Sequence, residues 1–371
     1  MRYLFDNEVV VAKSKEDQIS VGWGPYQFPR IHRVQNTLYL EFHMHADSAL
    51  SYGKENSKYV SYDFGDTWSE TSLQGGVELD DHEVITPLVM PPVKLEEVSL
   101  PAPIHSVKIY GLERKIYDES VLPSALSKWF ANRGQIGKLK QTELKISHKG
   151  FCRYQSEGVL PTNYFLRFYR DPENNLWALQ QRFLTENPRN NHALFYKSID
   201  NGHSFDLFSV IYYDEKYNDY DSSVDRVGFG EQSLTFTDEN HAFSLLRTTD
   251  GYKISPLYIS YSHDKAKTWS SPVIFDDLGV WPEVISLKNG AHIAGYGRPG
   301  LFIRGLYNNI WDEVRTEIVA PKEFQTDTCS YCSMAAISDD TFIIAYSDFR
   351  HACQDGKVVK AIMTKKIKVV I

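Results

Sequence analysis

The chain has 371 residues, of which 42% are hydrophobic and 24% charged, so its composition is that of a globular protein and excludes wholesale disorder. Its net charge of −8 argues against a broad nucleic-acid-binding surface, and no stretch approaches the roughly 20 apolar residues that span a bilayer. Aromatic residues make up 13% of the chain, which favours strand-rich folds and carbohydrate-facing clefts.

The N-terminal segment, MRYLFDNEVVVAKSKED, is too short and too charged in its apolar part for a secretory signal. We therefore expect a cytoplasmic protein, or a secreted or periplasmic one whose signal has been removed. The apolar part, NEVVVAKS, is predicted to pair as a strand with KAIMTKKIKVV at the C-terminus. Such a pairing would close a ring of strands and remove exposed edges.

Short strand patterns recur along the rest of the chain. TLYLEFHMH, NLWALQQRF, HAFSLLRT, AHIAGYGR and TFIIAYSD are each preceded by a polar turn. An apolar periodicity of helical length competes with these strands only around residues 121–132. The pattern therefore predicts an all-β protein.

An eight-residue repeat identifies the architecture. Ser61–Trp68 has the form S-x-D-x-G-x-T-W, Ser262–Trp269 repeats it with Ala266 in place of glycine, and Ser198–Phe205 is a third copy ending in S-F. The Asp carboxylate can accept hydrogen bonds from N–H groups of a hairpin turn, and glycine supplies a positive φ. We expect the repeats to be structural turns, with Ala266 slightly strained if its backbone is left-handed.

The spacing of the repeats gives the size of each unit. Asp264 follows Asp200 by 64 residues, and Asp200 follows Asp63 by 137, or about two intervals of 68. A chain of 371 residues then holds about six units. We predict a six-bladed β-propeller formed as a single domain by residues 1–371. Residues 92–150 are expected to be an irregular blade or insertion with a short helix at SALSKWFANR.

The four cysteines are too few for a disulfide scaffold. Cys329 and Cys332 form a CxxC, but no second CxxC or HxxxH accompanies it. Buried free thiols are the favoured interpretation, and we predict neither a metal nor a cofactor.

Aspartate repeats on a six-bladed propeller resemble the sialidase (neuraminidase) superfamily, in which they are called Asp boxes. The resemblance implies a retaining exo-α-sialidase that cleaves a terminal acidic sugar from a glycan. It also implies three arginines for the sugar carboxylate, a Tyr nucleophile assisted by a Glu, and an Asp acid/base. Sialidases are known exceptions to the two-carboxylate scheme of glycosidases.

The later part of the chain matches this set best. G-E-Q-S-L followed by S-L-L-R is similar to the family pattern and assigns Glu231 as the assisting carboxylate and Arg247 as the second arginine. G-R-P-G-L assigns Arg298 as the third arginine, with Arg304 as the rival. Y-C-S-M-A assigns Tyr331 as the nucleophile.

The N-terminal match departs from the family. The family has Arg-Ile-Pro, whereas this sequence reads F-P-R-I, so the proline is displaced. Arg30 is assigned as the first arginine, with Arg33 as the register alternative, and Asp47 as the acid/base in the loop before the first repeat.

His43 and His45 form an H-M-H pattern that alternation would place on one strand face. On a face that lines a cleft they would contact substrate, or one could act as a general base. Two alternatives therefore stay open: a propeller glycosidase or polysaccharide lyase for an arabinan- or uronate-type glycan, and a non-catalytic glycan-binding propeller.

Overall fold

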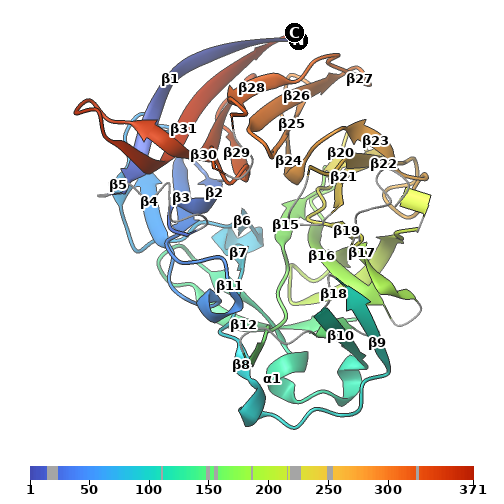
Figure 1. Cartoon of the computed structure of the whole chain (residues 1–371). Helices are drawn as coiled ribbons and strands as arrows, with labels where there is room; N and C mark the ends of the chain where they lie inside the picture. Colours follow the sequence, from blue (N-terminus) through green and yellow to red (C-terminus); the bar gives the residue numbers. More distant parts are fainter. Residues whose placement is uncertain are drawn as a thin grey trace. The chain divides into compact units, whose positions relative to one another are not determined.

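The computed structural model is built almost entirely of β-strands (Figure 1), as the sequence predicts. It separates into two compact units, and unit 1 contains Met1–Asp47, Glu55–Glu78 and Leu278–Ile371. Unit 2 contains Ser48–Lys54 and Leu79–Asp277. The structure describes residues 1–14, 24–109, 112–147, 151–153, 158–184, 187–214, 216–217, 227–248, 254–322 and 326–371.

Unit 1 contains three antiparallel sheets. The first has the strand order β2 (Gln27–Val34), β3 (Thr37–His43), β4 (Ser57–Ser61) and β5 (Ser69–Glu70). The second has the order β24 (Val280–Ser286), β25 (His292–Gly297) and β26 (Leu301–Tyr307), and both β27 (Ile310–Trp311) and β28 (Thr316–Val319) pair with β26. The third has the order β1 (Arg2–Lys13), β31 (Val358–Val370), β30 (Thr341–Ala352) and β29 (Cys332–Ala336). The short strand β6 (Val77–Glu78) also belongs to this unit.

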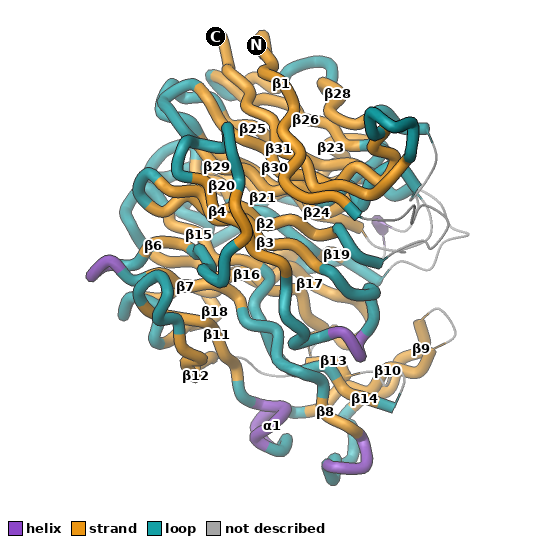
Figure 2. Tube along the Cα trace, turned by 90° about the vertical axis from the view of Figure 1, so that its left-hand side faces the viewer, coloured by secondary structure: helices purple, strands orange, loops and turns teal. Residues whose placement is uncertain are grey.

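The third sheet confirms the predicted pairing of the two ends of the chain. β1 runs antiparallel to β31 from Arg2, opposite Val370, to Lys13, opposite Ala361. Both views show the two strands side by side (Figures 1 and 2). The first strand in the sequence therefore completes the sheet made by the last three.

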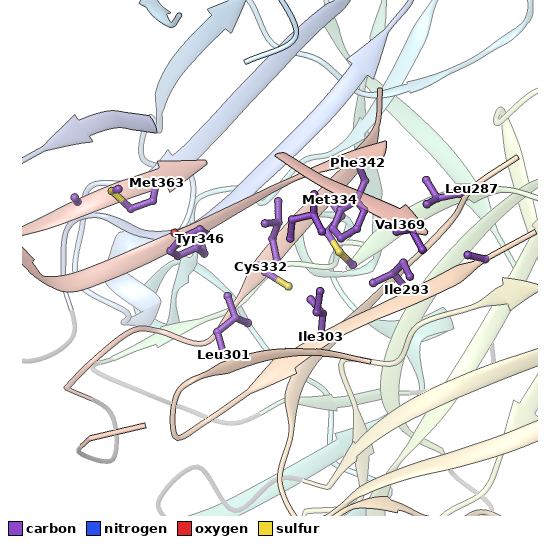
Figure 3. Packing of buried hydrophobic residues seen from close by; sticks show 14 residues of the cluster. Leu287, Ile293, Leu301, Ile303, Cys332, Met334, Phe342, Tyr346, Met363 and Val369 are labelled. Carbon is purple, nitrogen blue, oxygen red and sulfur yellow. The ribbon is translucent and has the colours of Figure 1, made fainter. Parts of the chain in front are cut away.

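Apolar side chains set the order of the three sheets in unit 1. Leu301 and Ile303 of β26 pack against Cys332, Met334 and their neighbours on β29 and β30 (Figure 3). On the other side, residues of β2 and β3 pack against β30 and β31. The sheet containing β29 thus lies between the sheets containing β2 and β24, and β29 contacts both of those strands.

Among its described residues, unit 2 contains two four-stranded meanders, a group of three strands joined to one of them, and a small inserted region. The strands of its two four-stranded meanders are β15 (Arg167–Arg170), β16 (Leu176–Leu184), β17 (Asn187–Ser198) and β18 (Ser204–Ile211), and then β19 (Phe229–Gly230), β21 (Ala242–Thr248), β22 (Leu257–Ser262) and β23 (Val273–Asp276), with β20 (Thr235–Phe236) beside β21. The group of three strands is β7 (Val84–Pro87), β11 (Trp129–Gly134) and β12 (Lys140–Ile146), and β12 joins β18 through only two parallel residue pairs. The described residues of each unit thus form three blade-like groups of strands, which is the number that six blades require.

The inserted region consists of short elements. Its elements are β8 (Val93–Lys94), β9 (His105–Ile109), β10 (Leu112–Tyr117), β13 (Phe151–Arg153), β14 (Val159–Leu160) and the single-turn helices η4 (Leu95–Glu97), η5 (Glu119–Val121) and α1 (Ser124–Ser127). Two further single turns are η2 (Ala49–Ser51) and η3 (Asp80–His82).

The predicted helix at SALSKWFANR is wrong beyond its first turn. α1 ends at Ser127, and Trp129 begins β11, whose side chains alternate between buried and half-buried. Burying Trp129 and Ala131 on one face of a strand wins over the helical propensity of the segment.

The three Asp repeats form the same turn, each between the last two strands of a meander. Taking Asp264 as the example, the carboxylate accepts hydrogen bonds from Thr268 N at 2.8 Å, Thr268 Oγ1 at 2.6 Å and Ser262 Oγ at 2.9 Å. Ala266 N donates to Ser262 Oγ at 2.9 Å, and the backbone of Ala266 is left-handed, with φ of 63°. Equivalent bonds surround Asp63 and Asp200. The structural interpretation of the repeats fits this geometry.

Candidate functional site

An aromatic cluster in unit 1 is centred on Tyr331, which immediately precedes β29. The Tyr331 ring contacts Phe28 of β2, with centroids 4.6 Å apart and planes at 65°. It also stacks on Trp281 of β24, with centroids 4.9 Å apart and planes at 23°. Three neighbouring sheets each supply one ring, so the half-buried Tyr331 is held between two aromatic side chains.

Bulges in β2 and β24 set the positions of the Phe28 and Trp281 rings. The register of β2 shifts between Gln27 and Arg30, and that of β24 shifts between Val280 and Glu283. Phe28 and Trp281 lie within these bulges with φ of 54° and 43°. Positive φ is rare for bulky aromatic residues and costs about 1–3 kcal/mol each, and such strain is concentrated at functional sites.

The displaced proline of the sequence belongs to the same feature. Phe28-Pro29 and Trp281-Pro282 occupy equivalent places in β2 and β24, inside the two bulges. Proline cannot donate a ladder hydrogen bond, and bulges are among the few places where a strand accepts it. The F-P-R-I order thus reflects a bulge that turns an aromatic ring toward Tyr331.

Two of the predicted arginines flank the aromatic cluster. The Arg298 guanidinium carbon lies 5.6 Å from the centroid of the Tyr331 ring, and Arg298 Nη2 donates to the Cys329 carbonyl at 2.9 Å. The Arg30 guanidinium carbon lies 5.9 Å from the Trp281 ring centroid. Tyr331, Arg298 and Arg30 are therefore brought together around one pair of stacked rings.

Arg30 differs from Arg33, Arg298 and Arg304 in the contacts of its guanidinium. It is half-buried, yet among the described residues its guanidinium makes no hydrogen bond or ion pair. Glu41 lies opposite Arg30 in the register of β2 and β3, but its carboxylate accepts a hydrogen bond from Gln74 Nε2 at 2.9 Å. A half-buried cation without a protein counterion beside aromatic rings is suited to bind an anionic ligand.

The rival arginines have structural contacts. Arg33 donates from Nε to the Gln35 carbonyl at 2.7 Å and from Nη1 to the Ala336 carbonyl at 2.9 Å. Arg304 donates from Nε to the Asp312 carbonyl at 2.6 Å. The contact with Tyr331 is made by Arg298, so the geometry favours Arg298 over Arg304 and Arg30 over Arg33 as site residues.

The two histidines have different environments, which corrects the expectation that both lie on one strand. β3 ends at His43, and His45 lies in the turn that follows, with its Nε2 3.2 Å from the Glu55 carbonyl oxygen. The His43 ring meets Phe28 edge-on at 5.3 Å. Burial, reinforced by the positive charge of Arg30, lowers the pKa of His43 to about 4, so its imidazole is neutral at pH 7.

Asp47 lies in the same loop beyond β3 and is exposed to solvent. It belongs to unit 1, as do Tyr331, Arg30 and Arg298. Its exposure is compatible with proton exchange with water, and its role as acid/base stays a prediction.

The other two predicted residues form an ion pair in unit 2. Arg247 Nη1 lies 2.6 Å from Glu231 Oε1, and both side chains are largely buried. Gly230 of β19 pairs with Arg247 of β21, and Glu231 follows with a positive φ of 47°. Glu231 N donates to Gln181 Oε1 at 2.7 Å. The ion pair fixes both side chains, and their catalytic and substrate-binding roles stay predictions.

Sequence reasoning did not single out the rings of Phe28 and Trp281. A signal was available in the aromatic-proline pair at the start of two inner strands, QFPRIH and VWPEVI. The CxxC cysteines Cys329 and Cys332, in contrast, are buried free thiols as predicted.

No protein-family model matches the sequence. No curated protein matches it either. In the described part of the chain, no helix is long and apolar enough to cross a membrane.

Solved structures are similar to the chain at low sequence identity. A protein of unknown function from Dyadobacter fermentans matches with a TM-score of 0.57 and 13% identity over 99% of both chains. The Hadza microbial sialidase Hz136 matches with a TM-score of 0.52 and 12% identity over 92% of this chain and 66% of its own. A Trypanosoma rangeli sialidase, in complex with 2,3-difluorosialic acid as a covalent intermediate, matches with a TM-score of 0.50 and 12% identity over 92% of this chain and 54% of its own.

The chain thus spans about two thirds of one of these sialidases and about half of the other. At such identities the likeness concerns the fold alone. The chain is an all-β protein with the β-propeller fold of these sialidases.

Proposed function

We propose that the protein is a glycoside hydrolase that removes a terminal acidic sugar of the sialic acid class from a glycan, with retention of configuration. The observation that carries this proposal is Arg30, a half-buried guanidinium without a hydrogen bond or ion pair among the described residues, beside the Tyr331–Trp281 stack. Arg298 supplies a second cation next to Tyr331.

In the proposed reaction, Arg30 and Arg298 bind the carboxylate on the anomeric carbon of the sugar. Guanidinium groups present paired N–H donors that match the geometry of a carboxylate. That carboxylate would repel a carboxylate nucleophile, whereas neutral Tyr331 avoids the repulsion. The Tyr331 oxygen attacks the anomeric carbon as the bond to the leaving oxygen breaks, and water later releases the sugar from Tyr331.

Proton transfers complete the proposed reaction. A phenol has an ordinary pKa near 10, so Tyr331 needs a base to accept its proton, and Glu231 is the predicted base. Asp47 is the predicted acid that protonates the leaving oxygen and then takes a proton from the attacking water. Arg247 is the predicted third arginine of the carboxylate site.

His43 supports a second candidate, a lyase or hydrolase for a uronate-containing glycan. Its imidazole is neutral at pH 7, lies edge-on to Phe28, and is near enough to Arg30 to be affected by that charge. A neutral histidine beside a carboxylate-binding arginine could remove the proton next to a uronate carboxylate.

The test is the release of a fluorophore from an α-linked N-acetylneuraminic acid glycoside by the wild type, Arg298→Ala and the control Arg33→Ala. We expect release by the wild type and by the Arg33 variant, and a loss of at least about a hundredfold in kcat/KM in Arg298→Ala. A folded wild type that releases no fluorophore would refute the sialidase proposal. Cleavage of a uronate glycan that is lost in His43→Gln would then favour the second candidate.

A further inference from the structure

We propose that Trp281 is a positioning residue that holds Tyr331 and Arg30 in place at the same time. This inference rests on the proposed function for its catalytic consequence, but its structural part can be tested without substrate. One side chain makes both contacts: the Trp281 ring stacks on Tyr331, and the Arg30 guanidinium carbon lies 5.9 Å from its centroid.

Trp281 is suited to this task because its own position is fixed. Its side chain is buried, with 7% of the residue exposed. It lies inside the bulge of β24, has a φ of 43° and is followed by Pro282, whose ring restricts the backbone. A rigid backbone with an unusual φ holds the indole ring in one orientation.

Tyr331 is held both by the segment that precedes it and by the rings beside it. It precedes the first residue of β29 and follows Ser330, which has a φ of 61°. The adjacent segment is anchored, because Cys329 N donates to Ser347 Oγ at 3.0 Å. The phenol ring itself is packed between Phe28 and Trp281. Removal of the Trp281 ring would leave one face of Tyr331 without this contact.

Arg30 depends on Trp281 for a different reason. Among the described residues its guanidinium has no hydrogen bond or ion pair, so the indole face is the main contact that orders it. A cation over an aromatic face is attracted to it, and most strongly to tryptophan. A leucine of similar apolar character would fill space without providing this face.

The experiment compares Trp281→Phe, which keeps an aromatic face, with Trp281→Leu, which does not. The control Trp68→Leu removes another tryptophan of unit 1, which packs with the core and donates from Nε1 to Thr364 Oγ1 at 3.2 Å. With the fluorogenic sialoside we expect Trp281→Leu to lower kcat by about ten- to a hundredfold and to raise KM. Trp281→Phe should retain kcat within about threefold, and Trp68→Leu should lower the melting temperature without changing kcat. Equal losses of kcat in Trp281→Leu and Trp68→Leu at similar melting temperatures would overturn the proposal.

A second measurement is independent of turnover. In protein labelled with 3-fluorotyrosine, the Tyr331 ¹⁹F resonance is assigned by its absence in Tyr331→Phe. The stacked indole should displace this resonance from its unstacked position, and Trp281→Leu should shift it toward that position and broaden it. An unchanged resonance in Trp281→Leu would refute the positioning role, whatever the substrate. A changed resonance in a protein that cleaves no sialoside would leave the positioning intact and refute the proposed function instead.

Discussion

Asp264→Ala is expected to lower the stability of the protein and to leave its turnover unchanged. The carboxylate accepts hydrogen bonds from the Thr268 side chain and backbone and from Ser262, and these bonds lower its pKa from 3.8 to about 2. For a buried group, the linkage of this pKa to folding would be worth about 2.5 kcal/mol. Because this carboxylate is accessible to solvent, screening reduces that value to about 1 kcal/mol.

Loss of the turn hydrogen bonds themselves brings the expected cost of Asp264→Ala to about 1–2 kcal/mol at pH 7. An unfolding entropy of about 2.1 cal/mol/K per residue over this chain converts this cost to a decrease of about 1–3 °C in melting temperature. Because the pKa is lower in the folded state, the stabilisation is present above about pH 4 and is lost as the pH falls toward 2. The cost of the substitution should therefore shrink by about half of its electrostatic part at pH 3.

Urea unfolding of wild type and Asp264→Ala at pH 7 and pH 3 measures both quantities. Lys267→Ala is the matched control, because Lys267 is an exposed residue of the same turn. A variant with unchanged stability and lost turnover would refute the interpretation of the repeat as a structural turn. A cost that is the same at both pH values would refute the assigned electrostatic contribution.

Three further predictions concern the site and its surroundings. Tyr331→Phe should lower kcat on the order of 10³-fold or more, while the Kd for N-acetylneuraminic acid, measured by calorimetry, changes little. Full activity of this variant would exclude Tyr331 as the nucleophile. Burial and the charge of Arg30 lower the pKa values of His32 and His43 to about 4. The neutral histidines therefore contribute their full share of the unfolding free energy above about pH 6.5, and this share is lost as the pH falls toward 4. Each histidine should lower the unfolding free energy by about 1–2 kcal/mol at pH 5 relative to pH 7. In urea unfolding, His32→Gln and His43→Gln should therefore lose less unfolding free energy than the wild type as the pH falls, and a pH profile equal to that of the wild type would contradict this. In unit 2, Glu119→Gln should lower the unfolding free energy by about 3–5 kcal/mol, because buried Arg182 loses the carboxylate that lies 2.9 Å from its Nη2. The control is Glu143→Gln at the exposed ion pair with Lys128, which should change the unfolding free energy by less than about 1 kcal/mol.

Much of the fold could be predicted because its signals are local. The S-x-D-x-G-x-T-W turn uses bonds within eight residues, as the contacts of Asp63 and Asp264 show. Alternation of apolar residues marked the strands, and the pairing of β1 with β31 followed from the need to cover a sheet edge. The strand that begins at Trp129 was less predictable, because the burial of Trp129 on a strand is decided by the surrounding sheets.

The candidate site was predictable only in part. Arg298 and Tyr331 lie 33 residues apart in sequence, and their order along the chain was enough to select both. The role of Trp281 could not be predicted from the sequence, because the sequence does not distinguish a ring that stacks in a site from a ring that packs in the core. The contact depends on two bulges that bring rings from separate strands together, and such long-range geometry has no local signal beyond the aromatic-proline pairs.

The measurement that tests the proposed carboxylate recognition most directly compares a substrate that carries a free carboxylate with its uncharged methyl ester. The wild type and Arg30→Ala are assayed with a fluorogenic α-sialoside and with the methyl ester of the same glycoside. We predict that the wild type prefers the free acid by about 30- to 100-fold in kcat/KM, and that Arg30→Ala loses most of this preference. Equal turnover of acid and ester by the wild type would contradict the role of Arg30 as a carboxylate-binding residue.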